Sequence, residues 1–180
     1  MKNPAIHTLP SLFLLLAATA LNAQAAAPDL SDAEVAHVAV TANSIDIDLA
    51  RFAQSQTRNA DVRQFAATMI TDHTAVNGQA AALAGRLGVT PKDNAVSQSL
   101  LAGAAEARKA VEPLQGGAFD RAYIDREVAY HQAVLDALDG LLIPTTANMD
   151  LKKLLVGVRP AIAAHLDHAR FLKGSLATTK

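Results

Sequence analysis

Hydrophobic residues recur at alternating steps of three and four in five segments of the chain, which is the spacing of one face of an α-helix. None of these segments shows the apolar–polar alternation that is typical of a half-buried β-strand. We expect long helices over about 31–56, 59–87, 116–142 and 148–176, and a shorter, less clearly amphipathic one over about 90–113. The sequence therefore predicts an all-α fold.

Several helix ends carry recognisable capping residues. Ser31 and Glu34 form a capping-box pattern, in which each side chain satisfies a free backbone amide at the start of the helix. Asn59 is a favourable N-cap for the second long helix, and Gly88 is a favourable C-cap. Pro144 follows the predicted end of the third long helix.

The lengths of the connections predict how the helices are arranged. Short links join the first long helix to the second and the third to the fourth, so each pair should form an antiparallel hairpin. Residues 88–116 are long enough to carry the chain back along the bundle between the two hairpins. We therefore expect a ferritin-like four-helix bundle, made of two antiparallel hairpins with a shorter crossover helix.

The first 25 residues have the pattern of a cleaved signal peptide. Lys2 provides the positive start, residues 12–21 form an apolar stretch, and Ala23-Gln24-Ala25 fits a small-x-small cleavage site. The apolar stretch is too short to span a bilayer comfortably. We expect a signal peptide over 1–25, a bundle domain over 26–180, a periplasmic location in a bacterium, and no stable membrane span after cleavage.

Composition excludes several kinds of site. The chain has no cysteine, which rules out disulfides, thiolate metal ligands and covalent c-type haem. Without Lys2 the balance is 15 basic and 17 acidic residues, a net charge of −2. Because the chain is nearly neutral and has no basic run, nucleic-acid binding is not expected. No glycine-rich loop suggests a nucleotide, and no serine with a base suggests a catalytic nucleophile.

Three histidines lie on the apolar faces of three different predicted helices: His73, His131 and His165. At a rise of 1.5 Å per residue, His73 and His131 each lie about 21 Å from the start of their helices, and His165 lies about 16 Å from the end of its helix. In the expected topology these depths agree to about one helical turn. The same depth on the first helix falls near Asp46, at the edge of its apolar face.

Buried imidazoles need partners for their ring nitrogens, so two interpretations follow. The four residues can be ligands of one transition-metal ion, with Asp46 as the weaker fourth candidate. Alternatively, the histidines form a buried hydrogen-bonded cluster in a structural or interaction module. A third reading is a pH-responsive bundle, since unperturbed imidazoles titrate near pH 6.5. Four further residues are candidates for supporting the ligands, namely Asp72, Asn77, Glu127 and His168.

Three segments resemble a bacterial family known as domain of unknown function 4142. They are Phe65 to His73 with Asn77, then Phe119 to Tyr123 followed by His131, and Pro160 with His165 and Ala169. The resemblance extends from about Ser31 to Leu176 and is carried by the order and spacing of these segments. It implies an exported, ferritin-like bundle that serves envelope or oxidative stress, and it implies no established activity.

The candidate ligands differ from those of di-iron ferritin-like enzymes, which use Glu-x-x-His pairs in the bundle core. Here Glu127 precedes His131 by four residues rather than three. A site rich in histidine suits zinc or copper at least as well as iron. Met69, one turn before His73, is better explained as core packing than as a haem ligand, so no haem is expected. We expect metal handling or protection rather than turnover of an organic substrate.

Overall fold

The computed structural model describes residues 29–178, and within this range the regular elements are all helices. The long helices are α1 (Asp32–Gln56), α2 (Ala60–Leu87), α3 (Ala95–Val111), α4 (Gly116–Ala137) and α6 (Met149–Thr178). A π-helical turn, η1 (Leu138–Leu142), and the short α5 (Ile143–Thr145) follow α4. The expected all-α fold is confirmed, whereas the predicted signal peptide at 1–25 lies outside the described residues.

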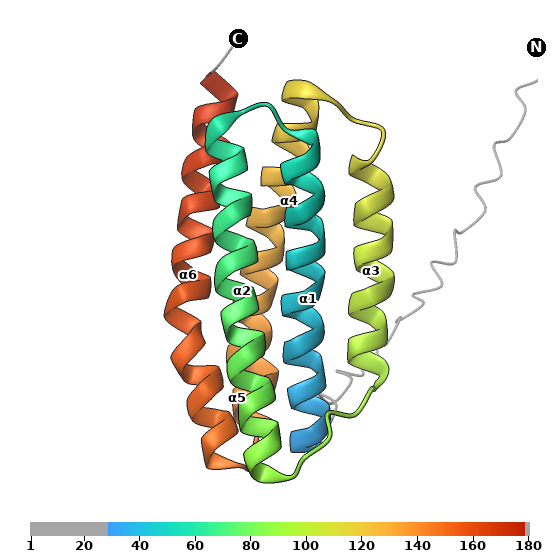
Figure 1. Ribbon diagram of the computed structural model, residues 1–180, viewed down its shortest axis with the longest axis vertical. Helices are drawn as coiled ribbons and strands as arrows, with labels where there is room; N and C mark the ends of the chain where they lie inside the picture. The colour runs from blue at the N-terminus through green and yellow to red at the C-terminus, as the bar shows by residue number, and fades with distance from the viewer. Residues whose placement is uncertain (1–28, 179–180) are drawn as a thin grey trace, which may run out of the picture.

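The helices form a bundle in which the chain runs up and down its long axis (Figure 1). α1 packs against α2 and runs in the opposite direction, and α4 packs in the same way against α6. α3 lies along α1 and leads from one end of the bundle to the other (Figure 1). No helix within residues 29–178 is long and apolar enough to cross a membrane.

Most of the predicted helix ends are confirmed. At the start of α1, Ser31 and Glu34 form the expected capping box. The Asn59 side chain accepts hydrogen bonds from the first backbone amides of α2. Gly88 ends α2 in the left-handed conformation, with φ +62°, which an L residue with a side chain adopts at a cost.

Two predicted boundaries were wrong. α3 begins at Ala95 rather than near residue 90, because Asn94 caps it with two hydrogen bonds while residues 88–94 form a loop along the start of α1. The helical path after α4 continues beyond Leu142 into α5. Pro144 does not stop it there, because proline lies in the first turn of α5, where its missing N–H is not needed.

The core has two halves of different composition. The aromatic half is built around Phe65, Phe119 and Tyr123, all fully buried. The aliphatic half contains mainly leucine, valine and isoleucine from α1, η1 and α6 and carries no phenylalanine or tyrosine. The two halves meet in the middle of the bundle, at the level of the three core histidines.

Candidate metal centre

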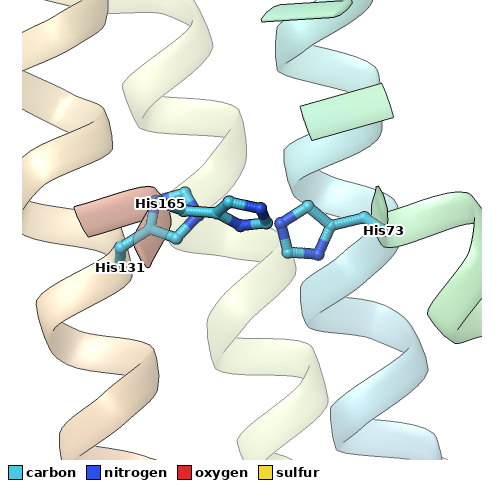
Figure 2. A group of neighbouring side chains, drawn as sticks. All are labelled: His73, His131 and His165. Carbon is cyan, nitrogen blue, oxygen red and sulfur yellow. The ribbon is translucent and has the colours of Figure 1, made fainter. Parts of the chain in front are cut away.

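Three histidine rings from three helices meet in the middle of the bundle (Figure 2). His73 comes from α2, His131 from α4 and His165 from α6, and all three side chains are buried. The ring centroids lie 5.3 Å apart for His73 and His165, 5.4 Å for His131 and His165, and 5.8 Å for His73 and His131. The structure therefore brings together the three histidines singled out by the sequence.

Hydrogen bonds fix which nitrogen of each ring carries the proton. Nδ1 of His73 lies 2.6 Å from Oδ1 of Asn43. Nδ1 of His131 lies 3.0 Å from the backbone carbonyl oxygen of Glu127, one turn earlier on the same helix. An amide oxygen and a carbonyl oxygen can only accept, so both Nδ1 atoms must be the donors. In the neutral rings, the lone pair is then on Nε2.

His165 is held in the opposite orientation. Its Nε2 lies 2.9 Å from Oδ2 of Asp72, whose carboxylate accepts the hydrogen bond and is about half-exposed. The lone pair of neutral His165 is therefore on Nδ1. A carboxylate or carbonyl behind the ring is the usual support for a metal-ligating histidine, because it fixes the tautomer and raises the basicity of the free nitrogen.

The remaining ring nitrogens are all buried and without a hydrogen-bonding partner: Nε2 of His73, Nε2 of His131 and Nδ1 of His165. The three residues offer ring nitrogens that lie within 4.8 Å of one another. A buried lone pair without a partner is costly. Its cost disappears when a cation occupies the space between the three rings.

Asp46, on α1, adds a carboxylate to this group. Its side chain is fully buried, with Oδ2 at 2.8 Å from Nε2 of His73 and 3.7 Å from Nε2 of His131. Neither Asp46 oxygen has a hydrogen-bonding partner in line. Burial alone would raise the pKa of Asp46, but the contact with His73 and the charges that His73 and His131 can carry outweigh it and lower the pKa to about 2. Asp46 is therefore an anion in direct contact with Nε2 of His73 and close to Nε2 of His131.

The pKa of the second carboxyl group, that of Glu127, shifts in the opposite direction. Burial, followed by the neighbouring charge of Asp46, raises the pKa of Glu127 well above its usual range. Arg126 opposes this shift in part, with Nη1 at 3.0 Å from Oε1 of Glu127 and 3.8 Å from Oδ1 of Asp46. The pKa values of the two buried acids thus move apart, because Asp46 contacts histidines whereas Glu127 is desolvated beside an anion.

Burial also lowers the pKa of His131 and of His165. Desolvation lowers the pKa of His131 to about 4, although Asp46 attracts the charged form. Desolvation lowers the pKa of His165 as well, against the hydrogen bond to Asp72. Both rings are therefore neutral at pH 7, which is the form that binds a metal.

The arrangement supports one ion rather than two. Asp46, Glu127 and His131 form a second group of possible ligands that shares His131 with the first. Since Nδ1 of His131 is a donor, only Nε2 can bind a metal, and it faces the other two histidines. The guanidinium of Arg126 already supplies a positive charge beside Glu127 and Asp46. The two groups therefore describe one site.

Two candidate supporting residues do not join the site. Asn77 was expected to reach His73, but its Nδ2 donates to Oγ of Ser44 at 3.3 Å, because its side chain points toward α1. His168 is exposed, and its ring packs edge-on against Phe65 at 5.2 Å between centroids. His168 lies just outside the narrow buried face of α6, and its ring is therefore turned away from the other histidines.

Sequence reasoning did not identify three residues that contact or adjoin the site. Asn43 holds His73 from the neighbouring helix, and its position three residues before Asp46 was the available signal. Arg126 was overlooked although it precedes Glu127 directly. Tyr123, one turn before Glu127, is fully buried, and its hydroxyl has no hydrogen-bonding partner.

Comparisons with known proteins agree with the resemblance seen in the sequence. The chain matches the family model described as domain of unknown function (DUF4142) over residues 17–172. The searches of curated proteins and of solved structures found no match. Because the family model covers most of the chain, the protein belongs to the DUF4142 family.

Proposed function

We propose that this protein binds one divalent transition-metal ion in the middle of its bundle, through His73, His131, His165 and Asp46. The observation that carries the proposal is that three buried imidazole nitrogens and a buried carboxylate, none with an aligned hydrogen bond, lie close together. Four electron-pair donors of this kind repel one another, and a metal ion is the partner that satisfies them together. Each of the four comes from a different helix.

The supporting contacts behind the rings strengthen this assignment. In each ring, the nitrogen that points away from the centre donates a hydrogen bond. The acceptors are Asn43 for His73, the Glu127 carbonyl for His131 and Asp72 for His165. In a purely structural cluster we would expect hydrogen bonds between the histidine rings. The three rings here do not hydrogen-bond to one another. Two ring nitrogens bound to the same ion lie at most about 4 Å apart, because each metal–nitrogen bond is about 2 Å long. We therefore expect the three rings to move slightly closer together around an ion.

Three nitrogens and one oxygen suit zinc, copper or iron, since imidazole binds all of these metals. Zinc is the first to test because a tetrahedral set of histidine and carboxylate ligands is common for it. The role we propose is metal handling or protection against metal or oxidative stress in the cell envelope.

We further propose that the bundle is of the ferritin-like type and that the mature protein is periplasmic. The first part is supported by the two antiparallel helix pairs, with α3 running between their ends (Figure 1). The second is supported by the signal-like pattern over residues 1–25. Mass measurement of the protein recovered from a periplasmic fraction tests it, and a mature chain that retains Lys2 would contradict it.

The metal proposal is tested with protein purified without a histidine tag. We expect isothermal titration with Zn²⁺ to give one ion per chain. His73→Gln, His131→Gln and His165→Gln should each weaken binding at least tenfold. The matched control is His168→Gln, which changes an exposed histidine on the same helix as His165 and should bind like the wild type. Failure of the wild type to retain zinc, copper or iron would refute the proposal.

A second candidate function follows from the 2.8 Å contact between His73 and Asp46. A proton in place of the metal would make His73 an imidazolium paired with the carboxylate, and the bundle would then be a structural or interaction module. Nitrogen-15 NMR of the ring separates the two cases. A doubly protonated His73 at pH 7 that persists in excess zinc favours the structural role.

A further inference from the structure

A cavity of about 50 Å³ lies in the aliphatic half of the core, directly next to the histidines. On each helix that carries a proposed ligand, the residue three positions from that ligand lines the cavity. The ligand and this residue lie on the same face of the helix. These residues are Asn43, Val76, Val134 and Ile162. The four proposed ligands therefore lie about one helical turn from the lining of the cavity.

Small side chains create this cavity. Ala36, Ala39, Ala42 and Ala80 line it from α1 and α2, where larger residues would fill the space between the helices. A second cavity, of about 40 Å³, shares Ala36 and Ala80 and extends the same space toward the end of the bundle. Together they form what we call the axial cavity, which reaches from the region of Asp32 to the histidine level.

The other side of the histidines is closed. Phe65, Met69 and Tyr123 are fully buried in the aromatic half. Two of these residues are large aromatics in edge-to-face contact, with ring centroids 6.2 Å apart. The cavity next to the histidine level therefore lies on the aliphatic side, opposite these packed side chains.

The chemistry of the lining determines what can occupy this space. A water molecule needs about 10–15 Å³ and two to four polar partners, whereas apolar cavities stay dry and take up xenon or benzene. Near the histidines the lining is aliphatic except for Asn43, and Oδ1 of Asn43 already accepts from His73. The volume is too small for a benzene-sized molecule but sufficient for a single xenon atom or a diatomic gas.

We propose that the axial cavity binds a small apolar gas molecule such as dioxygen next to the proposed metal ligands. Binding in the cavity depends only on its size and lining. Delivery of the gas to a bound ion rests in addition on the proposed metal-binding function.

Xenon is the probe for occupancy, used with metal-free protein so that the result is independent of metal binding. Under increasing xenon pressure, the methyl NMR signals of Val76 and Val134 should shift and saturate. Ala80→Val should lower the xenon affinity at least tenfold, because the added methyl groups fill the space. Ala81→Val, an exposed neighbour on α2, is the matched control and should leave the affinity unchanged. If Ala80→Val does not fold, Val134→Ile fills the cavity from α4.

Dioxygen itself provides the second measurement, because it is paramagnetic and speeds the relaxation of nearby protons. We expect stronger relaxation of the Val134 and Ile162 methyl groups than of the Met69 methyl group, which lies in the closed half. Shifts that stay linear with xenon pressure, or equal relaxation on both sides of the histidines, would overturn the proposal. Xenon binding in a protein that takes up no zinc, copper or iron would leave the cavity established and the metal function refuted.

Discussion

Asp46 and Glu127 are two fully buried acids whose pKa values shift in opposite directions. The contact with His73 lowers the pKa of Asp46 despite its burial, whereas burial and the charge of Asp46 raise the pKa of Glu127. A divalent ion beside them would lower the affinity of Glu127 for its proton. We therefore expect metal uptake to release protons and to strengthen as the pH rises.

The support that Asp72 gives to His165 can be tested separately from the ligands themselves. Asp72→Asn keeps the shape of the side chain but removes the charge that orients the ring and raises its basicity. Loss of such a supporting partner costs about 10–100-fold in metal affinity, and we expect a loss in that range by zinc titration. Asp48→Asn changes an exposed acid on α1 and is the control. Equal affinities of the two variants would show that Asp72 does not support a ligand.

The buried acids also determine how the stability of the metal-free protein depends on pH. The pKa of His131 falls to about 4 in the folded state, so its contribution is complete above pH 6.5 and is lost as the pH falls toward 4. The raised pKa of Glu127 acts in the opposite direction, because its contribution is complete below pH 4.5 and is lost as the pH rises. Above pH 4.5 the two effects therefore oppose each other.

Glu127→Gln should remove this compensation. We expect the free energy of unfolding of the variant to drop more steeply between pH 6.5 and 4.5 than that of the wild type, by up to about 3 kcal/mol. Urea unfolding at a series of pH values measures this. Glu106→Gln, at an exposed position, should follow the wild-type profile. A pH profile of the variant that runs parallel to that of the wild type would contradict the raised pKa of Glu127.

At the level of helices, the apolar repeat predicted most of the architecture, because burying one face of each helix dictates both its length and its contacts. It also placed His73, His131 and His165 at one depth. It could not identify the partner of His73, since spacing along one helix favoured Asn77 whereas Asn43 approaches from the next helix. Helical periodicity describes one helix at a time, and hydrogen bonds between helices depend on how the helices are rotated.

The left-handed end of α2 gives a test at this level. Gly88→Ala places a side chain at φ +62°, and we expect it to lower the free energy of unfolding by about 1 kcal/mol. Gly85→Ala, three residues earlier, lies inside the helix with nothing within 4 Å of the added Cβ, so it should raise stability by up to about 1 kcal/mol. Urea unfolding of both variants should give opposite signs, and equal signs would contradict the assigned end of the helix.

For the whole molecule, the candidate centre connects α1, α2, α4 and α6 at one level of the bundle. An ion bound to the native state alone stabilises it by mass action. At a free zinc concentration 100 times the Kd the gain is about 2.7 kcal/mol, which corresponds to about 5–10 °C in Tm for a domain of this size. Differential scanning calorimetry measures the shift. Magnesium, which prefers oxygen ligands, should leave Tm unchanged, and so should zinc added to His131→Gln.

The four proposed ligands are spread along the chain, from Asp46 near its beginning to His165 near its end, one on each of α1, α2, α4 and α6. A chain that has been synthesised or exported only in part does not contain all four proposed ligands. The full set can therefore hold an ion only after α1, α2, α4 and α6 have docked. A chain truncated before α6 would lose the centre entirely, so metal content would report directly on whether a molecule had finished folding.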